Sequence, residues 1–213
     1  MKVIDLSHTL QNDMPVFPGD TAPVFQKSMT HEKDNAQVTR MDLATHHGTH
    51  LDCPLHFIPD GKATDSSNIE NFFCDAFLAD CSAFKAGETI PESHFQELSV
   101  KWKAVKWIVI YTGWYKHWGG EKYFENFPVL SAEAANFLVK KGIVGIGLDV
   151  ISIDAIDSED YPIHNIILGN GLYIIENLTN LHSIRSDYFK LAAFPLKVKD
   201  GDGSPIRAAA LLD

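Results

Sequence analysis

Histidine and aspartate are densely placed between residues 46 and 56. The stretch reads His46-His47-Gly48-Thr49-His50-Leu51-Asp52-Cys53-Pro54-Leu55-His56 and holds four of the chain's ten histidines in eleven positions. Imidazole nitrogens and carboxylate oxygens are ligands that zinc takes from proteins, and manganese or iron accept the same groups. The spacing therefore predicts a site for a divalent metal.

The backbone of this stretch is expected to be extended up to its last histidine. Side chains alternate between the faces of an extended chain, so His46, His50 and Asp52 would share one side. A helix is less favourable because Gly48 and Pro54 both disfavour helical backbone. His46 would lie roughly 13 Å from His50 along an ideal strand, so we expect a bend at Gly48. Two nitrogens and one oxygen would leave a coordination position open, as in catalytic metal sites.

Two less specific interpretations concern the same stretch. It could be a histidine-rich surface strand or loop, but a solvated segment has no need of the interleaved glycine and proline. Cys53 could be a nucleophile or a ligand. Alternation points its side chain away from the histidine and aspartate face, and a free cysteine is usually a small buried apolar residue. We therefore expect Cys53 to belong to the core.

Composition limits the class of protein. The chain has 213 residues, of which 45% are hydrophobic and 22% charged, as in soluble globular enzymes. Its net charge of −10 argues against binding nucleic acid. No apolar run approaches the roughly 20 residues that span a membrane, and Asp5 comes too early for a signal peptide. With three cysteines, no complete disulfide framework forms. One cytoplasmic domain over residues 1–213 is expected.

The periodicity of apolar residues predicts a mixed α/β domain with more strand than helix. The clearest helix covers about 132–141, where Ser131 can cap the start and Gly142 follows the end. A shorter helix is expected at 91–98, with a proline first. The unit from 106 to 149 predicts two parallel strands joined by a helix. Strands are predicted at 3–6, 37–43, 71–81, 106–111, 143–149, 172–176, 191–196 and 206–212.

The first stretch supplies an incomplete metal site, so further ligands are expected elsewhere. Glu176 ends an apolar run, where a carboxylate is costly unless it is paired or bound to metal. A structural salt bridge remains an equal alternative for it. His164 follows a turn and, taken alone, is only a loop histidine. Asp149 ends another apolar strand, with Ser152 and Asp154 close behind, and these are expected to support the site by hydrogen bonds.

These residues together resemble a known family. The pattern His46-x-Gly48-Thr49-His50-x-Asp52-x-Pro54-x-His56 resembles the signature of the cyclase family of metal-dependent hydrolases, which includes bacterial kynurenine formamidase and isatin hydrolase. Residues 5–8, 15–20, 147–154 and 176–181 are similar to further family motifs. The resemblance therefore covers nearly the whole chain, and it implies a swivelling β/β/α fold, usually assembled as a homodimer or larger oligomer.

The resemblance also implies a site with two divalent metals per chain, zinc first and manganese second. His46, His50 and Asp52 would bind one metal, and Asp52 would bridge to a second one. The second metal would be held by His164 and Glu176. The alternative from a different functional class is a protein that binds these metals but does not catalyse a reaction. The apparently full set of ligands argues against this alternative.

The implied activity is hydrolysis of an aryl formamide or related amide of the N-formylkynurenine type. A water activated by the metal would attack the carbonyl carbon. His56 would move the proton to the leaving nitrogen, although it could instead be a ligand in a site with one metal. Phe17 stands where kynurenine formamidases have a tryptophan against the aromatic ring of the substrate, which leaves an isatin-type cyclic amide as an alternative. The aromatic cluster Trp114–Trp118 could line the pocket or pack the surface.

Overall fold

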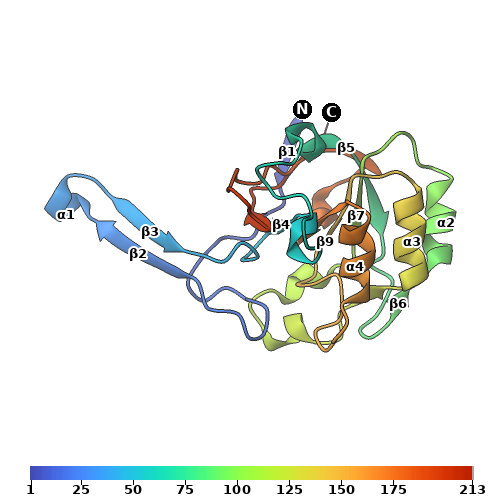
Figure 1. The fold of residues 1–213 in the computed structure, drawn as a ribbon, viewed down its shortest axis with the longest axis horizontal. Coiled ribbons are helices and arrows are strands. Elements are labelled where there is room, and N and C mark those ends of the chain that lie inside the picture. Colours follow the sequence, from blue (N-terminus) through green and yellow to red (C-terminus); the bar gives the residue numbers. More distant parts are fainter. Residues whose placement is uncertain (213) are drawn as a thin grey trace.

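A strongly curled mixed sheet forms the centre of the molecule (Figure 1). The computed structural model describes residues 1–212, and within this range the sheet has nine strands. Strands β5, β7, β9 and β10 run parallel, and the strands beyond them on both sides pair antiparallel. In spatial order the strands are β1 (Lys2–Asp5), β13 (Ala209–Leu212), β11 (Tyr188–Ala192), β5 (Phe73–Asp80), β7 (Trp107–Tyr111), β9 (Gly145–Leu148), β10 (Tyr173–Glu176), β4 (His50–Asp52) and β12 (Gly203–Pro205).

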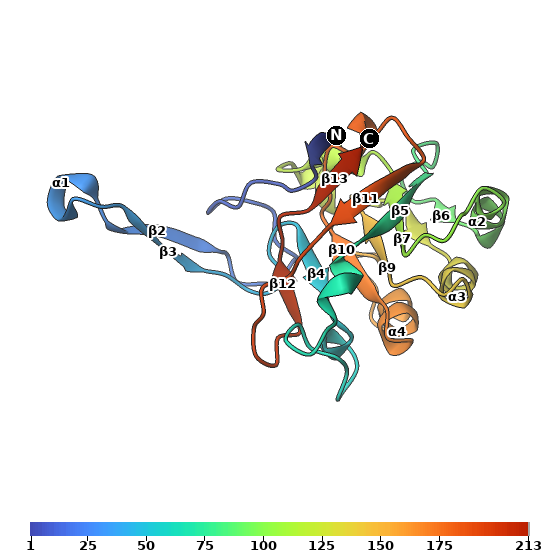
Figure 2. The ribbon, with the colours of Figure 1, turned by 90° about the horizontal axis from the view of Figure 1, so that it is seen from above.

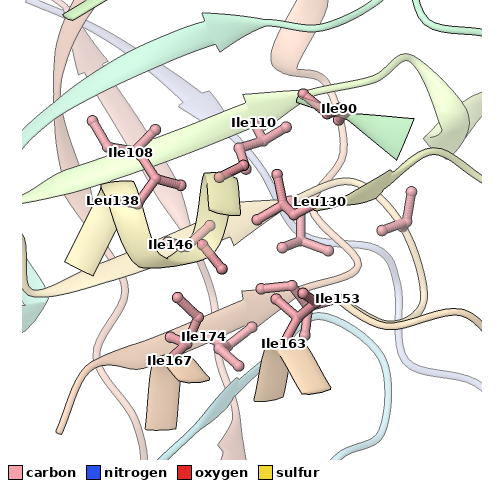
Figure 3. Close-up of a cluster of buried hydrophobic side chains, with 14 of the residues drawn as sticks. Ile90, Ile108, Ile110, Leu130, Leu138, Ile146, Ile153, Ile163, Ile167 and Ile174 are labelled. Atoms are coloured by element: carbon pink, nitrogen blue, oxygen red, sulfur yellow. The ribbon is translucent and has the colours of Figure 1, made fainter. Parts of the chain in front are cut away.

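Three helices cover one face of this sheet (Figure 2). They are α2 (Glu92–Ser99), α3 (Ala132–Lys140) and α4 (Pro162–Gly169). The hydroxyl of Ser131 accepts a hydrogen bond from the backbone of Ala134 at 3.1 Å, which caps α3 as predicted. Between helices and sheet lies a large apolar core, in which Ile108 and Ile146 of the parallel strands pack with Leu138 of α3 (Figure 3).

A second apolar core fills the opposite face of the sheet. Trp107 and Val109 alternate with Ile108 along β7 and belong to this second core. It also contains Leu51 of β4 and Leu191 of β11, so strands that are far apart in the sheet contribute side chains to the same core. The central parallel strands are therefore buried on both faces, which explains their continuous apolar sequences.

A long two-stranded arm projects from the body of the molecule (Figure 1). It consists of β2 (Val24–Met29) and β3 (Val38–Asp42), joined through the one-turn helix α1 (His31–Asp34). The residues of both strands are exposed, except for a half-buried Phe25. The arm begins just after residues 15–20 and ends just before residues 44–46, and both of these segments line the site described below.

The remaining elements are short. Strands β6 (Thr89–Ile90) and β8 (Val129–Leu130) form a separate parallel pair beside the helices. Single 3₁₀ turns occur at Pro54–His56, Ile69–Phe72, Trp114–His117, Glu121–Phe124 and Leu181–Ser183. None of the helices within residues 1–212 combines the length and the apolar character needed to cross a membrane.

The predicted α/β class is confirmed, and so is the parallel pair around 106–149, formed by β7, α3 and β9. Two predicted strand ranges are wrong by three or more residues at an end. The strand expected at 191–196 spans Tyr188–Ala192, because its pairing with β5 covers only these residues. The strand expected at 206–212 begins at Ala209, where pairing with β1 and β11 begins. Helix α4 was not predicted; its proline occupies the first turn, where no backbone donor is needed.

Candidate metal centre

Strand β4 places His50 and Asp52 on one side of the sheet. It pairs antiparallel with β10, and this register sets Glu176 directly opposite His50. The Nε2 atom of His50 lies 3.1 Å from Oδ1 of Asp52 and 3.4 Å from Oε2 of Glu176. All three side chains are buried, so two carboxylates face each other away from solvent.

The turn at Gly48 brings His46 back to the same carboxylates. Gly48 has a φ of +67°, and a Cβ atom there would lie 2.3 Å from Cδ2 of Leu10. The Nδ1 atom of His46 reaches Oδ1 of Asp52 at 2.6 Å. The bend predicted at Gly48 is therefore present. The extended chain predicted as far as His56 is wrong, because residues 54–56 form a 3₁₀ turn that starts at a proline.

Helix α4 supplies the fifth member of the cluster. His164 lies in its first turn, not in a loop, and is buried. Its Nε2 atom is 3.5 Å from Oε1 of Glu176 and 3.9 Å from Oδ2 of Asp52. The structure thus brings residues from β4, β10 and α4 to the point where the sequence predicts a metal.

The second ring nitrogen of each of these histidines has a fixed acceptor. Nδ1 of His50 donates to the carbonyl oxygen of Gly48 at 2.9 Å. Nδ1 of His164 donates to Asp154 at 2.7 Å, and Nε2 of His46 donates to Asp202 at 3.0 Å. The other nitrogen of each ring faces the carboxylates. In its neutral form each imidazole therefore presents a lone pair to the centre, as metal-binding histidines do.

Two groups of ligand atoms lie close enough to hold a metal ion. One consists of His46, Asp52 and His56, the other of His50, Asp52 and Glu176, and within each group the atoms lie within 4.8 Å of one another. Asp52 belongs to both groups. Its Oδ2 atom is buried and has no hydrogen-bond partner among the residues that the structure describes. Buried, unpaired carboxylate oxygens are costly, so this donor set fits one or two divalent cations.

The charges of the metal-free cluster lead to the same interpretation. Burial lowers the pKa of His50, but the charges of Asp52 and Glu176 outweigh it and raise that pKa to about 10. The pKa of His164 is likewise raised to about 10, against the effect of burial, by Asp154 and Glu176. Burial raises the pKa of Asp52, but the charges of His50 and His46 outweigh this effect and hold that pKa well below its usual range. Protons on the histidines thus neutralise buried carboxylates that a metal cation would otherwise neutralise.

A cavity of about 710 Å³ opens onto these residues. Phe17, Phe57 and Tyr161 provide apolar walls. Phe57 stacks on His164, with ring centroids 4.5 Å apart, and Tyr161 holds a left-handed backbone at a φ of 43°. Such a conformation is strained for a bulky residue and occurs mainly at functional sites. The cavity is suited to a small aromatic molecule placed against the cluster.

His56 lies at the edge of the cluster, where it faces the cavity. Its ring stacks on that of His46, with centroids 3.8 Å apart. Its Nδ1 atom is 3.7 Å from Oδ2 of Asp202. The side chain is partly exposed, in contrast to His50 and His164. This position suits either a proton carrier or an additional ligand.

The residues expected to support the site divide into two groups. Asp154 hydrogen-bonds to His164, and the backbone of Ile153 donates to Glu176 at 2.8 Å. Ser152 lines the cavity. Asp149 instead accepts hydrogen bonds from Thr112 and Gly113 and so holds the loop after β7.

Two further expectations concern residues away from the centre. Cys53 is buried in the second core, as predicted, and burial raises the pKa of its thiol to about 12. The Trp114–Trp118 cluster packs and does not line the cavity. The indole of Trp114 donates to the carbonyl oxygen of Tyr123 at 3.1 Å, and Trp118 stacks on His8.

Several residues of the site were not found from the sequence. Asp202 lies in an Asp-Gly-Asp-Gly segment that is typical of a turn, and Phe57 and Tyr161 look like ordinary apolar residues. Asn177 follows Glu176 and donates to the same carbonyl oxygen of Gly48 that accepts from His50. The signal that could have pointed to it is its place beside Glu176 in residues 176–181, which resemble a family motif.

Comparisons with known proteins give matches along nearly the whole chain. The model of the Cyclase family matches residues 4–155. A kynurenine formamidase of Bacillus cytotoxicus is 33% identical over 206 residues, which cover 96% of this chain and 95% of the relative. An isatin hydrolase bound to the product analogue thioisatinate superposes with a TM-score of 0.92 and 26% identity, covering 99% of this chain and 92% of that one. Isatin hydrolase A of Labrenzia aggregata, bound to benzyl benzoate, has a TM-score of 0.88 and 26% identity over 98% and 93% of the two chains.

Proposed function

The chain belongs to the Cyclase family, and from this premise we propose that it is a metal-dependent amidohydrolase that cleaves an aryl formamide of the N-formylkynurenine type. The observation that carries the proposal is the buried centre in which Asp52 is shared by two groups of ligand atoms and keeps one oxygen that accepts no hydrogen bond from any described residue. A purely structural tetrahedral site would need fewer polar groups. It would also have no reason to open into a cavity with aromatic walls.

The proposed ligands divide over two ions. As the family resemblance implies, His46, His50 and Asp52 would hold the first ion, and Asp52, His164 and Glu176 would hold the second. This division assigns His50 to the first ion, whereas by distance alone His50 groups with Asp52 and Glu176. Zinc is the proposed metal, with manganese as the alternative. Divalent ions at such a centre lower the pKa of water to near neutrality and polarise a carbonyl oxygen. The protein residues contribute the fixed orientation of the ligands and an enclosed cavity.

His56 is the proposed proton carrier. It faces the cavity from the edge of the cluster, where a substrate carbonyl and its leaving nitrogen would both be within reach. It takes a proton from the attacking water and delivers it to the nitrogen as the C–N bond breaks. Asp202 lies 3.7 Å from its Nδ1 atom, which leaves Nε2 free for this transfer.

The aromatic walls support an aromatic substrate. Phe17 and Phe57 offer flat apolar surfaces on which an aniline ring can stack, and Tyr161 adds a hydroxyl. Phenylalanine has no indole donor, so Phe17 contributes surface but no hydrogen bond. The second candidate is a cyclic aryl amide such as isatin, favoured by the close superposition of this chain on isatin hydrolases.

A side-by-side assay separates these candidates. Protein loaded with zinc or manganese is given N-formylkynurenine and isatin at equal concentrations, with metal-stripped protein and Asp52→Asn as controls. We expect hydrolysis of N-formylkynurenine by the loaded wild-type protein only. Preferred turnover of isatin would favour the second candidate. Turnover of neither compound would reject both and support the non-catalytic alternative.

We also propose that the chain works as a homodimer in the cytoplasm. An isolated two-stranded hairpin is at best marginally stable in water, yet the β2–β3 arm exposes Val24, Val38 and Met41. A second copy that packs on the arm would cover these side chains. The three cysteines are free thiols in the described chain, which suits a reducing compartment.

A further inference from the structure

The carboxylate of Asp202 lies in the site although no sequence pattern predicts it there. It lies just before β12, 156 positions after His46, and its side chain is 41% exposed. It lines the cavity. Like the buried Asp154, it accepts a hydrogen bond from the ring of a proposed metal-binding histidine. The role proposed below for Asp202 rests on the proposed metal centre and concerns only the orientation of the side chains around it.

Both oxygens of Asp202 are engaged by the segment that carries the first ligand. Oδ2 accepts from Nε2 of His46 at 3.0 Å, and Oδ1 accepts from the hydroxyl of Thr45 at the same distance. Oδ2 also lies 3.7 Å from Nδ1 of His56.

The backbone around Asp202 is built to fit the ring of His46. The carbonyl oxygen of Asp202 accepts from the backbone of Cys53 at 2.8 Å, and Gly203 pairs with Asp52 in the β12–β4 ladder. A Cβ atom at position 203 would lie 2.7 Å from Cε1 and 3.1 Å from Nε2 of His46. Gly203 therefore leaves space for the imidazole, and Asp202 fixes it there.

This arrangement gives His46 a tautomer opposite to that of the other two histidines. In their neutral, metal-binding forms, His50 and His164 would carry the proton on Nδ1 and face the centre with Nε2. His46 donates from Nε2 and faces the centre with Nδ1, which is 2.6 Å from Asp52. We propose that Asp202 is a positioning residue that fixes the Nε2–H tautomer of His46, so that Nδ1 binds the metal, and that holds His56 beside it.

The tautomer can be measured directly on the wild-type protein loaded with zinc. Nitrogen-15 NMR of the imidazole groups distinguishes Nε2–H from Nδ1–H, and His46 is assigned from the signal that His46→Gln loses. We expect Nε2–H for His46 and Nδ1–H for His50 and His164. An Nδ1–H signal for His46 would overturn the proposal while leaving the proposed function intact. Failure of zinc to bind the wild-type chain would overturn both.

Variants of Asp202 add an independent test by zinc affinity. Asp202→Ala removes the acceptor, and we expect affinity to fall by about 10–100-fold and His46 to populate both tautomers. Asp202→Asn keeps an oxygen acceptor, so the Nε2–H tautomer should persist. Asp200→Asn changes a neighbouring carboxylate without contact to His46 and serves as the control. Equal zinc affinity of Asp202→Ala and Asp200→Asn would contradict the positioning role, and the wild-type spectrum decides the matter if Asp202→Ala does not fold.

Discussion

The carboxylate of Asp154 accepts hydrogen bonds from both the backbone and the ring of His164. Oδ2 lies 2.9 Å from the backbone nitrogen and 2.7 Å from Nδ1 of His164, while Oδ1 accepts from the backbone of Ile163 at 2.9 Å. Tyr161, at the start of α4, makes no capping hydrogen bond with its side chain to any described residue. One carboxylate from the loop that precedes α4 thus caps the helix and orients a proposed metal ligand.

Replacing Asp154 should therefore affect stability and metal binding together. We expect Asp154→Ala to lower the free energy of unfolding of the metal-stripped protein by about 1–2 kcal/mol, as for a lost helix cap. Zinc affinity should fall by about 10–100-fold. Thermal unfolding and zinc titration measure the two effects. Asp157→Ala, which removes an exposed carboxylate of the same loop, is the control, and identical behaviour of the two variants would refute this role.

The protonated histidines predict how the stability of the metal-free protein depends on pH. Despite burial, carboxylates raise the pKa of His46 to about 9 and those of His50 and His164 to about 10. An unfolded histidine has a pKa of about 6.5. Because the folded values are higher, the stabilisation is fully present below pH 6.5 and is lost as the pH rises through 9 and 10.

We accordingly expect the Tm of metal-stripped protein to fall between pH 6.5 and pH 10. Zinc-loaded protein is the control, since its cations keep Asp52 and Glu176 neutralised after the histidines lose their protons. Its Tm should change less over the same range. Parallel curves for the two forms would mean that the histidine protons do not stabilise the cluster.

His56 provides a test of the proposed proton transfer. His56→Ala should keep its full metal content and lose about 10²–10⁴-fold in kcat, the usual contribution of a general acid–base group. His31→Ala, at the exposed tip of the arm, should leave both quantities unchanged. Metal analysis and steady-state kinetics give the answer. Loss of one metal per chain in His56→Ala would show that His56 is a ligand. The short distances between ligand atoms of His56, His46 and Asp52 also permit that role.

The arm predicts the location of the proposed dimer contact. Met41→Lys places a charge among the exposed apolar side chains of β3 and should shift the protein toward monomers in sedimentation equilibrium, with at least about a tenfold weaker dimer. Val100→Lys changes an apolar residue on the body that is even more exposed than Met41 and should leave the dimer intact. A monomeric wild-type protein, or a dimer insensitive to Met41→Lys, would disprove this contact.

The sequence predicted those parts of the site that lie close together along the chain. The bend at Gly48, the shared face of His50 and Asp52 and the burial of Cys53 all follow from spacing and residue type. Glu176 was suspected because a carboxylate ends an apolar run. These inferences need no knowledge of distant contacts.

Other parts depend on contacts between distant segments. Asp202 reaches His46 only because β12 pairs with β4, and nothing in an Asp-Gly-Asp-Gly segment reports that pairing. His164 was taken for a loop residue because the apolar stretch after Pro162 is short. The projecting arm was also missed, since the strand expected at 37–43 has the same alternation as a strand inside the main sheet.

The most direct test of the proposed centre is metal content per chain in wild type, Asp52→Ala and Glu176→Ala, with Asp157→Ala as control. Asp52 contributes to both groups of ligand atoms, and Glu176 to one. We predict about two metals per chain in saturated wild type and control, loss of both in Asp52→Ala, and loss of the second in Glu176→Ala, with hydrolysis abolished in both. Two metals and full activity in Glu176→Ala would contradict the shared centre.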